Sequence, residues 1–173
     1  MFALSITSKR LLASSGPWIL CAVCIGLAPL ASPEDVIAVS GSDAIAARQA
    51  SLDMSSLTFR SMRDAIKEGR EAKSQGYPAA VLAKWARVLP RMFPPGTGQG
   101  ETSVNSQARP AVWRDRPGFE RAAANYVDVT TRLAALAAAN DTPEFTRQLD
   151  AVDRACSLCH AGYKAGDQGP PKR

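Results

Sequence analysis

Cys156-Ser157-Leu158-Cys159-His160, near the C-terminal end of the 173-residue chain, is the stretch that decides the fold. Two cysteines three positions apart, followed directly by a histidine, form the c-type haem attachment pattern, in which the thiols add to haem vinyl groups and the imidazole binds iron. On a helix, residues three apart lie on one face, so both sulfur atoms can reach one porphyrin edge. The stretch therefore predicts one covalently attached haem c, with Cys156 and Cys159 as attachment sites and His160 as iron ligand.

Three other interpretations of the two cysteines are a redox dithiol, half of a zinc site and a disulfide. A zinc site needs a fourth ligand, but His160 is the only histidine, and the remaining cysteines, Cys21 and Cys24, lie in a segment that we expect to be removed. A thioredoxin-like dithiol is expected beside a βαβ pattern, and none surrounds this site. Haem attachment is therefore the favoured interpretation.

The first 31 residues have the pattern of a secretory signal peptide. Lys9 and Arg10 form a basic region, residues 18–30 are apolar, and small residues stand at Ala28 and Ala31. An uncleaved membrane anchor is the alternative, but the apolar run is shorter than the ~20 residues of a spanning helix unless residues 11–13 extend it. Covalent haem attachment is normally completed outside the cytoplasm. Signal and motif together therefore predict a bacterial periplasmic protein without stable membrane insertion.

Length and charge restrict the class of protein further. Cleavage after residue 31 leaves a chain of the size of one domain with a single core. Removing Lys9 and Arg10 leaves 19 of the 21 basic residues against 16 acidic ones, a formal charge of +3. So mild a charge is no nucleic-acid footprint, and we expect no nucleic-acid partner.

Helical periodicity dominates the mature chain, and no alternation typical of strands is found. Ile45, Leu52, Phe59 and Ile66 recur every seven residues on one face of the first expected helix. The expected helices cover residues 43–68, 78–89, 117–140 and 142–165, with Ser42 or Asp43 capping the first and Thr142 the last. In the second helix the expected inner face is Val81, Leu82, Trp85, Val88 and Leu89.

Between the second and third helices lies a segment rich in Gly, Pro, Ser and Asn, from Phe93 to Arg116. It is too long for a plain turn and is best explained as a crossover connection, with Trp113 returning to the core. The prediction is an all-α fold: a four-helix bundle with a long crossover loop between helices 2 and 3 and the haem held by helix 4. Residues 32–42 are expected to form a flexible lead-in, 43–165 the bundle, and 166–173 a disordered tail.

Four stretches in this order resemble the cytochrome c′ family, whose members carry the haem motif near the C-terminus of a four-helix bundle. The resemblance covers residues 43–164, and its most specific part is the haem motif itself. The stretches are Arg48-Gln49-Ala50-Ser51-Leu52, Phe93-Pro94-Pro95-Gly96-Thr97, Arg109-Pro110-Ala111-Val112-Trp113 and Cys156 to Lys164.

The resemblance implies that His160 is the proximal ligand and that Leu52 faces the distal side of the iron. Relatives with methionine at the latter position tend to be six-coordinate and low-spin, whereas an apolar residue leaves the iron five-coordinate and high-spin. A leucine has no lone pair to donate. The implied distal face is apolar, admits NO and CO, and offers bound oxygen no hydrogen-bond donor.

The same matching implies roles for five further residues. Arg48 and Gln49 would donate to the haem propionates, Phe59 and Phe93 would line the haem, and Lys164 would shape the proximal pocket. Each has a simpler alternative: a solvated helix residue for Arg48, ordinary core packing for the two phenylalanines, and a solvent-facing residue for Lys164.

The leading hypothesis is a periplasmic monohaem cytochrome that binds NO or CO, transfers single electrons to a small redox partner protein, or both. It is not expected to be an enzyme, because peroxidase-type chemistry lacks a second histidine, acid or base over the iron. A homodimer through the first two helices follows the family habit and is compatible with Leu57.

Two rival functions stay open. The first is a six-coordinate electron carrier with Met54, Met62 or Met92 as axial ligand, which requires a different register of the first helix. Met54 is two residues from Leu52, about 200° away on a helix, and should face away from the iron whenever Leu52 faces it. The second rival is haem storage without redox or gas traffic.

Overall fold

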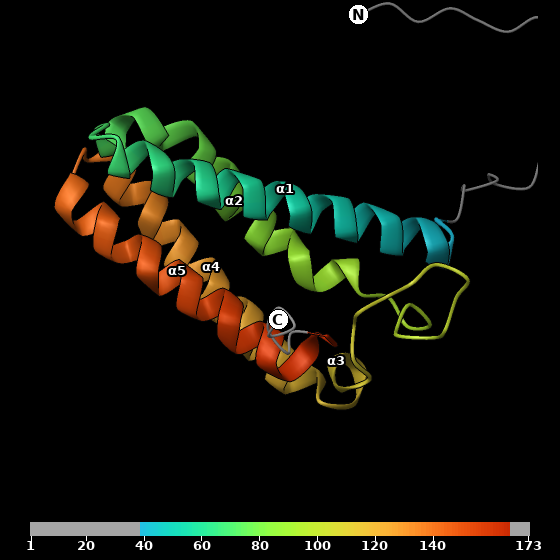
Figure 1. The fold of residues 1–173 in the computed structure, drawn as a ribbon. Helices are drawn as coiled ribbons and strands as arrows, with labels where there is room; N and C mark the ends of the chain where they lie inside the picture. The colour runs from blue at the N-terminus through green and yellow to red at the C-terminus, as the bar shows by residue number, and fades with distance from the viewer. Residues whose placement is uncertain (1–38, 167–173) are drawn as a thin grey trace, which may run out of the picture. The chain divides into compact units, whose positions relative to one another are not determined.

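The computed structural model describes residues 39–166. The expected signal peptide, most of the lead-in and nearly all of the expected tail lie outside these residues. Four long helices make up the described part: α1 (Gly41–Lys67), α2 (Gly76–Val88), α4 (Arg116–Ala138) and α5 (Thr142–Tyr163) (Figure 1). The shorter elements are α3 (Ala111–Arg114) and two 3₁₀ turns, η1 (Ala72–Gln75) and η2 (Leu89–Met92).

This architecture confirms the predicted all-α four-helix bundle and its long connection between the second and third long helices. The described residues contain no strand, only one isolated bridge between Ala108 and Lys164. The connection holds one turn of helix, α3, that the sequence did not predict. None of the described helices is long and apolar enough to cross a membrane.

The capping residues of α1 and α5 differ from the sequence-based expectation. Ser40, not Ser42 or Asp43, caps α1, because its hydroxyl accepts from the Asp43 backbone N–H at 3.1 Å. Asp141 caps α5 by accepting from Glu144 N–H, also at 3.1 Å. Thr142, the expected cap, instead accepts from the backbone N–H of Ala72 and so ties the α1–α2 connection to α5.

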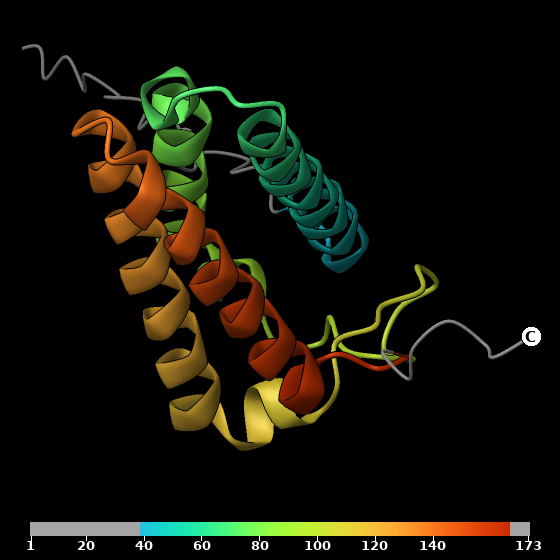
Figure 2. The ribbon, with the colours of Figure 1, turned by 60° about the vertical axis from the view of Figure 1, so that its left-hand side comes forward.

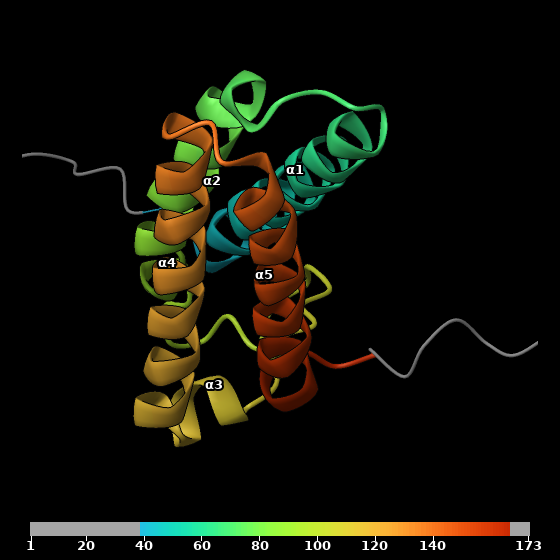
Figure 3. The same cartoon turned by 90° about the vertical axis from the view of Figure 1, so that its left-hand side faces the viewer.

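The main core lies where α4 packs against α2 and α5. Figures 2 and 3 show α4 and α5 side by side along their length, while α1 crosses them at an angle. Contacts between α1 and α5 are correspondingly few. The largest fully buried side chains of this core are Met62, Leu82, Leu133, Phe145 and Val152. The bundle is therefore tightest around α4 and leaves room between α1 and the C-terminal half of α5.

A second, smaller core forms under the crossover loop. Ala108, Val112 and Phe119 are buried there, and Trp113 packs against them. The indole N–H of Trp113 donates to the backbone oxygen of Phe93 at 3.1 Å. The expectation that Trp113 returns to the core is confirmed.

The expected inner face of α2 is partly wrong. Leu82 and Leu89 are buried, but Val81 and Val88 are 40% and 42% exposed. Three alanines of α2, Ala79, Ala83 and Ala86, occupy the buried face instead. Small side chains let α2 approach α4 closely, and this rotates the two valines outward.

Candidate haem site

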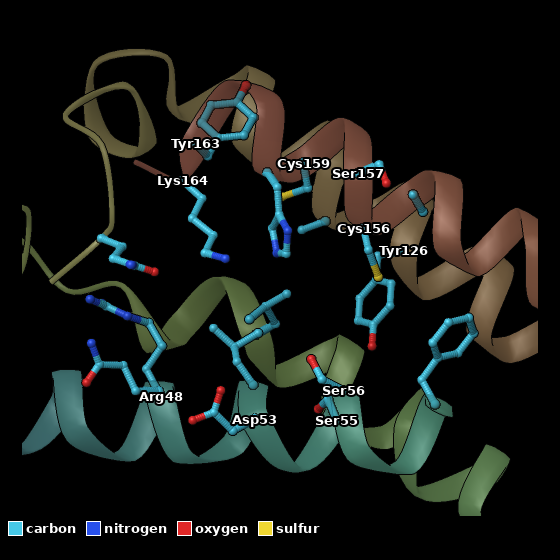
Figure 4. A pocket seen from close by; sticks show the side chains of 18 of the residues that line it. Arg48, Asp53, Ser55, Ser56, Tyr126, Cys156, Ser157, Cys159, Tyr163 and Lys164 are labelled. Atoms are coloured by element: carbon cyan, nitrogen blue, oxygen red, sulfur yellow. The ribbon is translucent and has the colours of Figure 1, made fainter. Parts of the chain in front are cut away.

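A cavity of about 710 Å³ lies between α1 and α5, with α4 and the crossover loop as its other walls (Figure 4). Its volume lies within the range of ligand-binding pockets. Every site residue named from the sequence lines it, so the structure brings together side chains from three distant parts of the chain. These residues are Arg48, Gln49, Leu52, Phe59, Phe93, Cys156, Cys159, His160 and Lys164.

The proximal wall is α5, which presents the haem motif to the cavity. Cys156 and Cys159 are half-buried and not disulfide-bonded to each other, so the disulfide interpretation does not apply. Burial, together with the nearby carboxylate of Asp153 and the other thiol, raises the pKa of Cys156 to about 11. Burial also raises the pKa of Cys159. Both thiols are thus protonated at neutral pH, unlike those of a reactive redox dithiol.

The zinc interpretation also lacks support in this part of the chain. Within residues 39–166, no group of three or more His, Cys, Asp or Glu side chains is placed to hold a metal ion. Two thiols and one imidazole on a single helical turn suit a porphyrin, which brings its own four nitrogen ligands.

The opposite wall is α1, where Leu52 lines the cavity half-buried. Met54 is 67% exposed, Met62 is fully buried in the core, and Met92 lies outside the lining. None of the methionines that the structure describes therefore reaches the cavity. The register of α1 matches the one in which Leu52, and not a thioether, faces the iron.

The α1 wall is less apolar than the sequence led us to expect. Asp53, Ser55 and Ser56 line the cavity beside Leu52 (Figure 4). The hydroxyl of Ser55 donates to the Ser51 backbone oxygen at 2.8 Å and is thereby occupied. One carboxylate and two hydroxyl groups thus share the α1 wall of the cavity with Leu52, and the apolar distal face stays a prediction.

Arg48 is buried, with only 3% of its surface exposed, which rules out the solvated-residue alternative. Its Nη1 donates to the backbone oxygen of Met92 at 3.0 Å and to Thr97 Oγ1 at 3.1 Å. Its Nη2 donates to the backbone oxygen of Thr97 and to Ser106 Oγ, both at 3.0 Å. The guanidinium also stacks 4.3 Å from the centre of the Phe93 ring. Burial lowers the pKa of Arg48, but an arginine stays charged in proteins.

Arg48 therefore clamps the crossover loop to α1, a role that the sequence did not suggest. A guanidinium has five N–H donors, and the loop occupies four of them. Gln49 behaves similarly, since its amide donates to the Asn105 backbone oxygen at 2.7 Å. That Arg48 and Gln49 donate to the haem propionates stays a prediction. The same two side chains also hold the crossover loop by hydrogen bonds.

The same loop is fastened to the end of α5. The backbone N–H of Arg109 donates to Tyr163 O at 2.9 Å, and that of Ala165 donates to Gln107 O at 2.7 Å. The side chain of Arg109 adds a hydrogen bond to the backbone oxygen of Ala161 at 3.0 Å. The loop thus connects the wall that carries Leu52 with the turn that follows the haem motif.

Three aromatic rings of the lining form a continuous edge-to-face series. The centres of Phe93 and Phe119 are 4.9 Å apart, and those of Phe119 and Tyr163 are 5.3 Å apart. Neither Phe119 nor Tyr163 was predicted from the sequence as part of the cavity wall. Tyr126 of α4 also lines the cavity and was not predicted from the sequence to do so.

The residues present fit a haem. Two thiols and an imidazole lie on one wall, and aromatic and aliphatic side chains flank the cavity. The guanidinium and amide groups of Arg48 and Gln49 lie in the same lining, where they match the two carboxylates of a propionate pair. A helical bundle whose last long helix presents Cys-x-x-Cys-His to such a cavity is a c-type cytochrome.

Comparison with known proteins agrees. The family model of cytochrome c′ matches residues 43–164. The chain belongs to the cytochrome c′ family. Members of this family carry one covalently attached haem c, which confirms the predicted cofactor.

Individual relatives are distant in sequence. Cytochrome c′ of Rhodospirillum rubrum is 30% identical over 87 residues, which are 50% of this chain and 57% of that relative. Cytochrome c′ of Rubrivivax gelatinosus is 27% identical over 125 residues, covering 70% of this chain and 94% of the relative. The chain thus spans little more than half of the first relative and nearly all of the second.

Among solved structures, a nitric oxide complex of a variant cytochrome c′ from Alcaligenes xylosoxidans is similar to this fold. The TM-score is 0.65 at 25% identity, over 73% of this chain and 97% of that chain.

Proposed function

We propose that this protein is a periplasmic cytochrome whose haem iron is five-coordinate and high-spin, and that it binds NO or CO, transfers single electrons, or both. Haem bound here supplies an iron with one axial ligand and a one-electron redox couple. The observation that carries the proposal is the register of α1: Leu52 lines the cavity, and no described methionine does. The nitric oxide complex of the Alcaligenes relative supports the choice of gas.

Residues on two opposite walls of the cavity would have different roles. His160 on α5 would hold the iron, and Cys156 and Cys159 would fix the porphyrin edge, so that the macrocycle cannot leave. Leu52 on α1 would restrict the opposite face to ligands as small as a diatomic gas. His160 is the sole histidine of the sequence, so no second imidazole is on hand as an acid–base catalyst. We therefore propose no substrate turnover.

The spin state tests this function. Purified protein should give a high-spin optical and EPR spectrum at neutral pH, and Leu52→Met should convert most of it to a low-spin form, because a thioether then faces the iron. Leu57→Met is the matched control on the same helix: its side chain is 61% exposed, and the spectrum should not change. A low-spin spectrum of the unaltered protein in both oxidation states would overturn the open-site proposal.

We further propose a homodimer that uses α1 and α2. Exposed large apolar side chains are concentrated on these two helices: Met54 and Leu57 on α1, and Tyr77, Val81 and Val88 on α2. Burying such side chains between two copies would remove apolar surface from water.

A charge in this surface should separate the copies. With Leu57→Asp and Val88→Asp combined, light scattering after size exclusion should report the monomer mass, where the unaltered protein gives twice that mass. The control is Leu158→Asp on α5, a side chain that is 70% exposed and lies outside the proposed surface. A monomeric unaltered protein at tens of micromolar would contradict the dimer and leave the haem proposal intact.

A further inference from the structure

Leu158 is a large apolar side chain on the outside of the helix that carries the haem motif. It lies between the two attachment residues, Cys156 and Cys159, and is 70% exposed. The other large apolar side chains that the structure describes as exposed lie on α1, on α2 or just before α1. One peptide bond joins Leu158 to Cys159, whose side chain lines the cavity. At Leu158 the protein surface is therefore only a few covalent bonds from the site of haem attachment.

The ring of Tyr163 makes a second connection between the cavity and this part of the surface. It lines the cavity and packs edge to face on Phe119, with the ring centres 5.3 Å apart. Its hydroxyl donates to the carboxylate of Asp115 at 3.1 Å, and Figure 4 shows that hydroxyl directed away from the cavity. A protein bound at the C-terminal end of α5 would thus approach the cavity both along the backbone and through an aromatic ring.

Positive charge surrounds Leu158. Arg154 lies one helical turn before it on the same face of α5 and is exposed. The guanidinium of Arg109 donates to the backbone oxygen of Ala161, three residues after Leu158, at 3.0 Å. Arg121, exposed on α4, interacts electrostatically with the phenol at the end of α5. We call Leu158 and these three arginines the Leu158 face.

The carboxylates that flank Arg154 in the sequence do not neutralise it. Asp150 and Asp153 instead pair with Arg63 of α1, at 3.1 and 3.8 Å. Within residues 39–166, neither Arg121 nor Arg154 forms an ion pair. The Leu158 face therefore keeps a positive charge that carboxylates of another protein can neutralise.

The exposed part of the cavity lining has no such preference for one sign of charge. Its exposed charged residues are Asp53 and Arg60 on α1 and Asp153 on α5. A charged partner would be attracted and repelled there at once. An apolar centre within charges of a single sign, as around Leu158, suits a partner of the opposite charge.

We propose that the Leu158 face docks an acidic redox protein, one whose own redox centre lies beneath a carboxylate-rich surface. The inference rests on the proposed electron-transfer function and adds the kind of partner to it. One electron passes from the reduced partner to the ferric haem. The partner is oxidised by one electron, the iron becomes ferrous, and no bond forms or breaks. Opposite charges speed the encounter and orient the partner, and Leu158 becomes buried at the centre of the contact.

Reversing two charges of the Leu158 face tests the proposal, with a plant-type [2Fe–2S] ferredoxin as the acidic probe. In Arg121→Glu combined with Arg154→Glu, the second-order rate constant for reduction of the ferric protein by reduced ferredoxin should fall about tenfold at low ionic strength. Binding of oxidised ferredoxin to the ferric protein, measured by calorimetry, should weaken about as much, although no electron then flows. Both effects should shrink to about twofold or less at about 0.5 M salt, which screens exposed charges.

Leu158→Ala tests the apolar centre of the face without changing its charge. Removing apolar side-chain area from the contact should weaken ferredoxin binding about fivefold. Because no charge is altered, this loss should be similar at low and at high salt.

Lys73→Glu combined with Arg132→Glu is the matched control. Both residues are exposed and lie toward the other end of the bundle, where Lys73 N–H donates to Asn140 and Arg132 interacts electrostatically with Glu144. The change in net charge is the same, but the rate constant and the affinity should change by less than about twofold. Arg60→Glu, which tests entry beside the exposed cavity lining, should have an equally small effect.

Equal losses in the two double variants would show that only net charge matters and would overturn the proposal. A loss confined to Arg60→Glu would overturn it as well. Protein that dithionite reduces and that then binds CO, but whose reaction with ferredoxin is the same in every variant, would refute this inference alone and leave the proposed function standing. Protein that dithionite does not reduce would refute the electron-transfer function and this inference together.

Discussion

Replacing both attachment residues, Cys156→Ser and Cys159→Ser, is expected to abolish covalent haem binding. Acid–acetone extraction should then remove all of the haem, and the intact mass after denaturation should be that of the polypeptide alone. The reason is chemical: serine hydroxyl groups do not form the thioether bonds that the two half-buried thiols of α5 would make with vinyl groups. The unaltered protein should keep its haem under both treatments.

The same change should also weaken the fold. Without haem, the cavity of about 710 Å³ would be held open by α1 and α5, which touch little elsewhere. The aliphatic and aromatic side chains that the haem would cover are then exposed to water, and the hydrophobic contribution of covering them is lost. We therefore expect the haem-free chain to lose helical circular dichroism at a much lower denaturant concentration.

Single variants provide the control. Cys156→Ser or Cys159→Ser alone leaves one thioether, so haem should stay attached after extraction in the fraction of molecules that were modified. Covalent haem in the double variant would contradict the assignment of these two residues. A double variant that retains extractable haem with full helicity would contradict only the stability argument.

Much of this fold is predictable because it follows local patterns. The seven-residue recurrence from Ile45 to Ile66 marks α1, and the Gly- and Pro-rich composition after Phe93 marks the crossover loop. Pro143 and the acid that follows mark the start of α5 to within a residue. Such signals depend on residues close in sequence. The helices were therefore correct, and the errors concern their ends and rotation.

The rotation of α2 shows where local patterns end. Val81 and Val88 have the spacing of a buried face, but so do Ala79, Ala83 and Ala86, and periodicity alone cannot choose between two apolar faces. The choice is made by α4, against which only the small side chains allow close packing. The sequence of α2 alone does not show which helix packs against it.

The contacts of the cavity wall were hidden for a similar reason. Arg48 bonds to residues 44 to 58 positions away, whose hydroxyl and backbone oxygens carry no recognisable motif. Tyr126 has the spacing of a core residue, and only its place in the cavity lining distinguishes it from one. The resemblance supplied Arg48 as a propionate partner, but its hydrogen bonds to the crossover loop emerged only from the fold.

Arg48→Met is the second change with a large expected effect. The methionine keeps the length and the apolar stem but removes the charge, and it leaves four hydrogen-bond acceptors of the loop, from Met92, Thr97 and Ser106, without their donor. Breaking a buried charged network by removing one partner costs about 3–5 kcal/mol. We expect the free energy of unfolding to fall by that amount, as measured by denaturant titration of the haem-loaded protein.

Limited proteolysis should locate the effect. Cleavage should appear between residues 97 and 107, because this part of the loop loses its attachment to α1. The stability and protease resistance of Arg48→Lys should lie between those of the unaltered protein and those of Arg48→Met. An ammonium keeps the charge but cannot reach four acceptors in the geometry of a guanidinium. Arg60→Met is the matched control: Arg60 lies at the same cavity, is exposed, and should change stability by less than about 0.5 kcal/mol.

Thr97→Val distinguishes the hold on the loop from a purely propionate role. It preserves the shape of the side chain but removes the hydroxyl that accepts from Arg48 and donates to the Pro94 backbone oxygen at 2.7 Å. If Arg48 stabilises the protein through the loop, combining Arg48→Met with Thr97→Val should lower the free energy of unfolding by less than the sum of the two single effects. The coupling energy should be about 0.5–3 kcal/mol. Strict additivity, with proteolysis of the loop unchanged in Arg48→Met, would show that the haem carboxylates and not the loop are the main partners of Arg48.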